Sequence, residues 1–306
     1  MTSRLQKSLI LLLFGSLGVL LLLPVPRFVD DHYLLGMLQN AGHAPGFAML
    51  TCGFLYLVNA RSRAAYVSVI GIVLVFAVAS EVLQHFTHRQ FSIADIASDF
   101  VGVSFGFLVW LLCVDRRVRR DPWLRRLSAT GAAAALLLML APPLMGISIW
   151  LDRHAKFPVL LEPAMADVLS MTGSLGKRDE VEITLHADRV SIDLLAGPRP
   201  GLVIKDFVSD WQGFDTLVIE VGKFDEGDLL LELYVRDAAS APAGSDWFFA
   251  HAMIESEGWH QLRFALDDIK NGPQGRLADL RHISSIGLHR REGTAARFSI
   301  RKIYLR

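Results

Sequence analysis

The residues best suited to chemistry lie where two long apolar segments of the sequence meet. The first segment closes with polar residues at three- and four-residue steps: Glu81, Gln84, His85 and His88. This spacing places their side chains on one face of a helix. Carboxylate, amide and imidazole groups on one face can bind a polar ligand or hold a metal ion.

The second segment opens with further polar residues. Ser92 and Asp95 have the spacing of a helix capping box, and Asp99 follows one turn deeper on the same face. Glu81 and Asp99 each stand about a turn or more inside apolar sequence, where an ionised carboxylate costs up to ~3 kcal/mol. Arg89, in the connecting loop, is the available counter-charge. We expect the following residues to converge near the outer face of the membrane: Glu81, Gln84, Arg89, Asp95 and Asp99.

This polar cluster has three interpretations. It could only lock two helices together, or it could bind a polar ligand or a lipid head group. A metal site of Glu81, His85 and His88 fits one helix face but has no defined fourth ligand. The sequence therefore predicts neither a metal nor another cofactor. His43, beside Pro45 at the start of an earlier apolar segment, could join the polar site or cap a helix.

Five apolar stretches, with their flanks, are long enough to cross a membrane, which takes about 20 mostly apolar residues. They cover residues 8–23, 43–58, 64–83, 93–114 and 127–150. Pro24-Val25-Pro26-Arg27 is not a small-residue cleavage site, so we expect the first stretch to be an anchor rather than a signal peptide. Gly102 and Gly106 form a GxxxG motif, for which we expect packing within the chain. Residues 1–150 are therefore predicted to form an α-helical transmembrane bundle of about five helices.

The charge pattern indicates the orientation of this bundle. Residues 1–150 carry 12 Lys and Arg against 7 Asp and Glu, whereas residues 151–306 carry 19 against 24. Basic residues gather at the N-terminus and in two loops, around 61–63 and 116–126. Because such loops stay in the cytoplasm, we expect a cytoplasmic N-terminus and an extracytoplasmic C-terminal domain.

A neutral chain argues against nucleic acid as a partner, and membrane lipid is the expected one.

Several of these residues together resemble the signature of the VanZ-like family. The matching residues are Glu81-x-x-Gln84, Arg89, Ser92-x-x-Asp95 and Asp99-x-x-Gly102-x-x-x-Gly106, with His43 and Phe47 upstream. The resemblance covers about residues 25–115. One departure is Gln39-Asn40, where the family often has an Asp-Lys pair. The resemblance implies a small helical domain in the bacterial cytoplasmic membrane, in a family whose founding members confer glycopeptide (teicoplanin) resistance. It implies no particular reaction.

After Trp150 the long apolar runs give way to short alternating ones. In the run from Leu229 to Arg236, apolar residues alternate with polar or aromatic ones from Leu231 onward, as in a half-buried strand. Nine such segments with turn signals between them predict an all-β sandwich or jelly roll over residues 180–306. Residues 151–179 are predicted to be a tether. Its apolar residues at helical spacing favour a short amphipathic helix: Leu161, Met165, Val168 and Leu169.

The sandwich region resembles the galactose-binding-like jelly rolls of carbohydrate-binding modules. The resemblance rests on Trp211-x-Gly-Phe-Asp-Thr-Leu, Gly258-Trp259 and Ile283-x-x-Ile286-Gly-Leu. Such domains stack sugars on exposed aromatic rings. Because Trp247, Phe248 and Phe249 are consecutive, at least one should point outward from a strand and could form a glycan platform. Trp211 and Trp259 stand where we expect core tryptophans.

Two functions from different classes fit the sequence. We prefer a non-enzymatic protein of the cell envelope, whose outward-facing domain binds a glycan or a protein partner. The alternative is a membrane enzyme or transporter that acts on a lipid-linked envelope precursor through Glu81 and Asp99. The sequence contains no nucleophile elbow, zinc-protease helix or phosphate-binding glycine loop, so an enzyme is the less expected class.

Overall fold

The computed structural model describes residues 32–85, 93–174, 181–195, 200–240, 246–290 and 295–306. The chain divides into two compact units, with Ile147 the last residue of the first and Ser148 in the second. The predicted span 8–23 lies outside the described residues, as do His88, Arg89 and Ser92.

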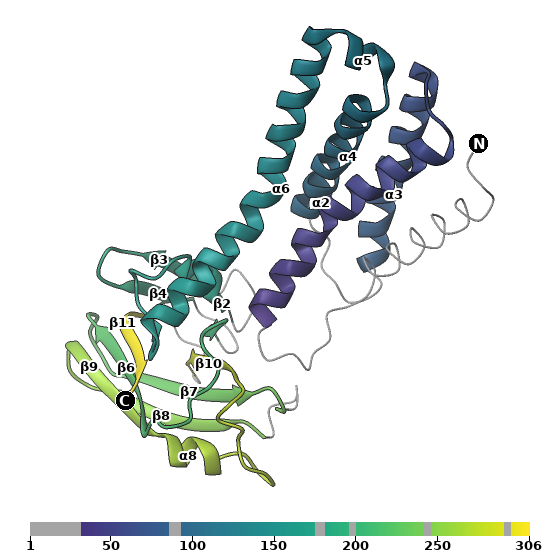
Figure 1. The fold of residues 1–306 in the computed structure, drawn as a ribbon. Helices are drawn as coiled ribbons and strands as arrows, with labels where there is room; N and C mark the ends of the chain where they lie inside the picture. Colours follow the sequence, from purple (N-terminus) through teal and green to yellow (C-terminus); the bar gives the residue numbers. More distant parts are fainter. Residues whose placement is uncertain (1–31, 86–92, 175–180, 196–199, 241–245, 291–294) are drawn as a thin grey trace. The chain divides into compact units, whose positions relative to one another are not determined.

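Long helices make up the first unit (Figure 1). Helix α2 covers His32–Leu57, α3 covers Arg63–His85 and α4 covers Ile93–Cys113. The short α5, Arg116–Arg120, precedes α6, Pro122–Lys156, which contains Pro142 and Pro143 and belongs to this unit as far as Ile147. Buried apolar residues of α2, α3 and α4 form the core between them: Phe47, Leu50, Leu55, Val69, Val73, Ala77, Val103 and Trp110.

Three of the described helices are long and apolar enough to cross a membrane. They cover Arg63–Leu83, Ile93–Cys113 and Pro122–Lys156, and they contain most or all of the third, fourth and fifth predicted spans. Helix α2 contains all but the last residue of the second predicted span but is not one of the three, and its polar residues include His43 and Thr51, both buried. The structure therefore confirms apolar helices of membrane-spanning length but not a count of about five.

Helices α2 and α4 pack backbone against backbone. A Cβ atom added to Gly102 would overlap the carbonyl oxygen of Ala44 and lie 2.9 Å from its Cα, and one added to Gly106 would overlap the carbonyl oxygen of Ala48. Real Cβ atoms essentially never come this close to a backbone, so both positions need glycine. The GxxxG motif thus joins α4 to α2 within the chain, as predicted.

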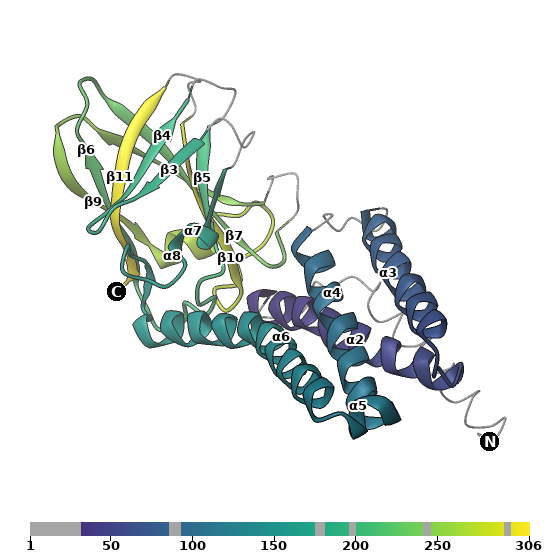
Figure 2. The same ribbon diagram turned by 90° about the horizontal axis from the view of Figure 1, so that it is seen from above.

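The second unit is a sandwich of two antiparallel sheets that face each other across a common core (Figures 1 and 2). The first sheet has the order β3-β4-β11-β6-β9, with β1 also paired to β11. Its strands are β1 Val159–Leu161, β3 Val181–Leu185, β4 Val190–Leu194, β6 Thr216–Lys223, β9 Gly258–Ala265 and β11 Ala296–Leu305. The second sheet has the order β2-β5-β10-β7-β8. Its strands are β2 Thr172–Ser174, β5 Gly201–Lys205, β7 Leu229–Asp237, β8 Phe248–Ile254 and β10 Ile283–His289.

The segment from 151 to 174 joins this sandwich through its apolar side chains. Strand β1 pairs with β11, and β2 pairs with β5. Between them lies the four-residue helix α7, Val168–Met171. Leu161, Met165, Val168 and Met171 are buried in the core of the sandwich, whereas Leu169 is exposed. A second short helix, α8, covers Leu266–Asn271.

The α2–α4 contact predicts a large effect of a small substitution. Gly102→Ala puts a methyl group against the Ala44 backbone, so the helices must separate, and we expect a loss of about 1–3 kcal/mol of stability. Gly71→Ala in α3 is the matched control, because nothing lies within 4 Å of a Cβ there. Thermal unfolding of the full chain in detergent checks the prediction. Equal melting temperatures for the two variants would contradict it.

Candidate functional sites

The first candidate site is a buried polar cluster that takes one residue from each of three helices. His43 of α2, Glu81 of α3 and Asp99 of α4 are all 0% exposed. The nearest ligand atoms of the three side chains all lie within 4.8 Å of one another. His43 Nδ1 and Asp99 Oδ1 are 3.1 Å apart and share a hydrogen bond, although 56 residues separate them. The Gly102–Ala44 contact, one residue past His43 and three past Asp99, holds this pair together.

The structure describes only part of the polar set that the sequence singles out. Glu81, Asp99 and His43 come together, whereas Asp95 is half-buried in the first turn of α4. Gln84 lies in α3, but its side chain is outside the described part of the chain, as is that of His85. The convergence of the full set, including Arg89 and Ser92, remains a prediction.

The second candidate site is the outer face of the second sheet, where β10, β7 and β8 run side by side. Leu231, Leu233 and Val235 of β7 point into the core, so the alternate residues Glu232, Tyr234 and Arg236 point outward. On β8, Phe248 packs in the core and Phe249 points outward with 43% of its surface exposed. Of the three consecutive aromatics, Phe249 and its neighbour Trp247 thus belong to the outer face.

Aromatic rings on this outer face stack on one another. The Tyr234 ring lies 5.1 Å from Trp247 and 6.5 Å from Phe249, and Trp247 and Phe249 are stacked at 6.0 Å with 21° between their planes. The Arg236 guanidinium lies 4.5 Å from the centre of the Trp247 ring. Tyr234 lies flat against Gly287 of β10, where any Cβ would overlap its ring. Burial raises the pKa of Tyr234 to about 12, so its hydroxyl stays protonated.

Polar groups border the stacked rings. His289 Nε2 on β10 lies 2.8 Å from Glu232 Oε2, and His251 Nε2 on β8 lies 3.8 Å from Glu232 Oε1. The ring of His289 also lies 6.1 Å from that of Tyr234. We call these residues together the aromatic face: Glu232, Tyr234, Arg236, Trp247, Phe249, His251 and His289. It offers flat apolar rings, a guanidinium, a carboxylate and imidazoles on one side of a rigid sheet.

An ion-pair network braces the chain next to this face. Arg276 donates two hydrogen bonds to the buried Asp237 carboxylate, from Nη1 at 2.5 Å and from Nη2 at 2.7 Å. Arg276 Nε donates to Asp246 Oδ2 at 2.8 Å. Because Asp237 ends β7 and Asp246 precedes Trp247, Arg276 ties the start of β8 to the end of β7. Nothing in local sequence patterns points to this network, since 39 residues separate Asp237 and Arg276.

The ion-pair network around Arg276 also shifts the pKa values of its own charged groups. Burial acts to raise the pKa of the Asp237 carboxyl, but bonds from Arg276, the Asp279 backbone N–H and the Ser240 hydroxyl outweigh it and hold the pKa below its usual range. The same ion pair raises the pKa of Arg276. Both groups therefore stay charged at neutral pH.

The two predicted core tryptophans differ in position. Trp211 is 0% exposed and packs in the core, which confirms the prediction. Trp259 is half-buried on the outer face of the first sheet, so the prediction was wrong for it. Along β9, Leu262 and Phe264 face the core, which turns residue 259 outward. Its ring lies 5.6 Å from that of Phe224 and 4.0 Å below the Arg301 guanidinium.

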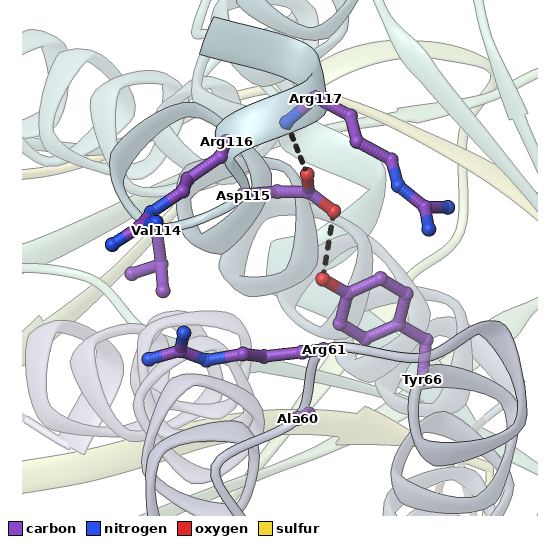
Figure 3. A pocket seen from close by; sticks show the side chains of 7 residues that line it. All are labelled: Ala60, Arg61, Tyr66, Val114, Asp115, Arg116 and Arg117. Carbon is purple, nitrogen blue, oxygen red and sulfur yellow. Dashed lines mark hydrogen bonds between the residues drawn. The ribbon is translucent and has the colours of Figure 1, made fainter.

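In the helical unit, basic residues line a small pocket (Figure 3). Arg61, from the turn after α2, and Arg116 and Arg117, at the start of α5, surround Asp115 and Tyr66. The Tyr66 hydroxyl and the Arg117 backbone N–H each donate to the Asp115 carboxylate at 2.8 Å. Burial acts to raise the pKa of Asp115, but these bonds hold it below its usual range. Two of the predicted cytoplasmic loops thus meet at one end of the helical unit.

Comparison with known proteins finds similarity for the C-terminal region. No protein-family model matches the chain, and no curated protein matches it. The C-terminal region resembles carbohydrate-binding modules among the solved structures. A family 11 carbohydrate-binding module from Clostridium thermocellum, in complex with a β-1,3-1,4-mixed-linked tetrasaccharide, is 13% identical over 48% of this chain and 94% of its own, with a TM-score of 0.39.

Two further solved structures show the same level of similarity. A family 29 carbohydrate-binding module variant is 12% identical over 48% of this chain and 89% of its own, with a TM-score of 0.34. An agarase is 14% identical over 48% of this chain and 26% of its own, with a TM-score of 0.39. Similarity at this level assigns no function to the chain, so function has to be inferred from its own side chains.

The ion pair between Arg276 and Asp237 predicts that the stability of the sandwich depends on pH. Because the pKa of Asp237 is lowered by folding, its contribution is fully present above the unfolded pKa of about 3.9 and is lost as pH falls through the lower folded value. Asp237→Asn should therefore cost about 2–3 kcal/mol at pH 7 and less at pH 3, which lies below the unfolded pKa. Hydrogen exchange of peptides from β7 and β10 measures the loss. The control is Asp188→Asn, whose side chain is 64% exposed. An Asp237→Asn deficit that is equal at both pH values would contradict the role of the charge.

Proposed function

We propose that this protein is a membrane-anchored protein of the bacterial cell envelope whose β-sandwich binds a glycan on the aromatic face. The observation that carries the proposal is the cluster of Tyr234, Trp247 and Phe249 on one side of the sheet. The C–H faces of pyranose rings are apolar and flat, so they stack on exposed aromatic rings and leave their hydroxyls at the edges. Arg236, Glu232 and His251 lie at those edges to donate and accept hydrogen bonds.

The exposure of this face supports ligand binding over internal packing. Phe249 is 43% exposed and Met253, four residues along the same strand, is 53% exposed. His251 between them has 49% of its side chain exposed. A stripe of aromatic, thioether and imidazole groups on one sheet face is costly to leave in water and suits a partner with mixed apolar and polar surface.

We propose the VanZ-like type and the predicted orientation for the helical part. The basic loops that contain Arg61 and Arg116 lie at one end of the helical unit, in keeping with a single cytoplasmic side. The sandwich would then be periplasmic, within reach of envelope glycans. Alkaline phosphatase fused after Arg306 would be active in this orientation. Activity of a cytoplasmic reporter alone at that position would contradict it.

The alternative, an enzyme or transporter for a lipid-linked envelope precursor, would work through Glu81 and Asp99. Both carboxylates are 0% exposed, and Asp99 is bonded to His43. Burial of this kind favours a role inside the helical bundle over contact with a large precursor. We therefore propose binding by the sandwich, and not catalysis by the cluster, as the main function.

The glycan proposal predicts a sharp difference between two exposed aromatic sites. Trp247→Ala and Phe249→Ala each remove a ring of the aromatic face, and we expect each to weaken binding about tenfold or more, equivalent to about 1.4 kcal/mol. Phe224→Ala is the matched control, because Phe224 is 50% exposed but lies beside Trp259, away from the aromatic face. A glycan array probed with the full chain in detergent identifies the best oligosaccharide, and calorimetry then gives the affinities.

The outcome is decisive in either direction. Loss of affinity in Trp247→Ala and Phe249→Ala with unchanged affinity in Phe224→Ala supports the proposal. Equal affinities in all variants, or no glycan bound by the wild-type chain on the array, would overturn it.

A further inference from the structure

The buried cluster of the helical unit has the composition of a metal site. His43, Glu81 and Asp99 come from three different helices, and their ligand atoms lie within 4.8 Å of one another. In a tetrahedral site with metal–ligand distances of about 2.0–2.2 Å, neighbouring ligand atoms stand about 3.4 Å apart. Side-chain shifts of up to about 1.5 Å would therefore bring all three side chains into contact with one ion.

The hydrogen bond between His43 and Asp99 does not account for the whole cluster. It uses Nδ1 of the imidazole and Oδ1 of the carboxylate. His43 Nε2 and Asp99 Oδ2 are buried without a hydrogen-bond partner among the described residues. Buried polar atoms are almost always satisfied in native proteins, so two on one pair indicate a missing partner. A metal ion bound by both residues would satisfy them.

Charge gives the second reason. Two ionised carboxylates inside an apolar helical unit carry a net charge of −2, which is costly to bury. A divalent cation with a neutral imidazole makes the buried assembly neutral. An imidazole nitrogen with two carboxylate oxygens suits Zn²⁺ or Mn²⁺, whereas Mg²⁺ and Ca²⁺ prefer all-oxygen sites.

We propose that His43, Glu81 and Asp99 bind one divalent transition-metal ion, Zn²⁺ or Mn²⁺, that ties α2, α3 and α4 together. The site differs from the one-helix arrangement of Glu81, His85 and His88 that sequence spacing offers. It takes one ligand from each helix, and three protein ligands leave a coordination position open for water or another group. Since α2 and α4 already touch at Gly102 and Gly106, the ion would fix α3 against that pair.

The test uses the full chain in detergent, stripped of metal with a chelator. Zn²⁺ and Mn²⁺ are titrated by calorimetry, with Mg²⁺ for comparison, and bound metal is counted by mass spectrometry. We expect one ion per wild-type chain and a rise in melting temperature when the ion is added. Asp99→Asn and Glu81→Gln should weaken binding at least tenfold. Asp188→Asn is the control, because this carboxylate belongs to the other unit and its side chain is 64% exposed, and it should bind like wild type.

Each result decides the proposal. No ion bound above the level of the detergent blank, or an Asp99→Asn chain with wild-type affinity and stoichiometry, would overturn it. If the Asp99 and Glu81 variants fail to fold, the wild-type chain alone suffices. Its melting temperature should fall on chelation and recover with Zn²⁺ or Mn²⁺, and a melting temperature insensitive to both steps would also overturn the proposal. Because this site lies in the helical unit, its failure leaves the glycan proposal untouched.

Discussion

The aromatic face depends on the contact between the Tyr234 ring and Gly287. Only a residue without a Cβ allows the ring to lie on the neighbouring strand, and any side chain at 287 would lift it away. With Tyr234 held flat and almost fully buried, Trp247 and Phe249 stack against it. The rings that remain partly exposed are therefore fixed in place before any ligand arrives, which lowers the entropy cost of binding.

The flanking contacts hold the same arrangement. Arg276 joins Asp237 at the end of β7 to Asp246 beside Trp247, so the residues at the edge of the face are tied to the sheet. Glu232 and His289 pair across β7 and β10. Glycine has the same role in the helical unit. Gly102 and Gly106 allow α4 to pack closely against α2, and this contact brings Asp99 to His43. In both units, a glycine that permits close approach positions a polar or aromatic group.

Local patterns were sufficient to predict most elements but not the long-range pairs. Alternation along β7 correctly separated the core leucines from Glu232, Tyr234 and Arg236, and the apolar runs marked α3, α4 and α6. The same alternation, applied from Leu262, would have placed Trp259 outward. The sequence did not decide whether His43 joins the polar site or caps a helix, because its partner Asp99 lies 56 residues away. The ion pair between Arg276 and Asp237 likewise joins residues far apart in the sequence. Such pairs depend on how sheets and helices pack, which local periodicity does not encode.

The most direct test of the glycan-binding account is hydroxyl-radical footprinting of the full chain with and without a bound oligosaccharide. Hydroxyl radicals oxidise Trp, Phe and Met side chains where they are exposed. The aromatic face and the control site around Phe224 and Trp259 both contain such side chains, so oxidation reports on each. The account predicts several-fold protection of Trp247, Phe249 and Met253 on ligand addition, with unchanged oxidation of Phe224 and Trp259 on the opposite sheet. Protection of Phe224 and Trp259 in place of Trp247 and Phe249, with the ligand demonstrably bound, would contradict it.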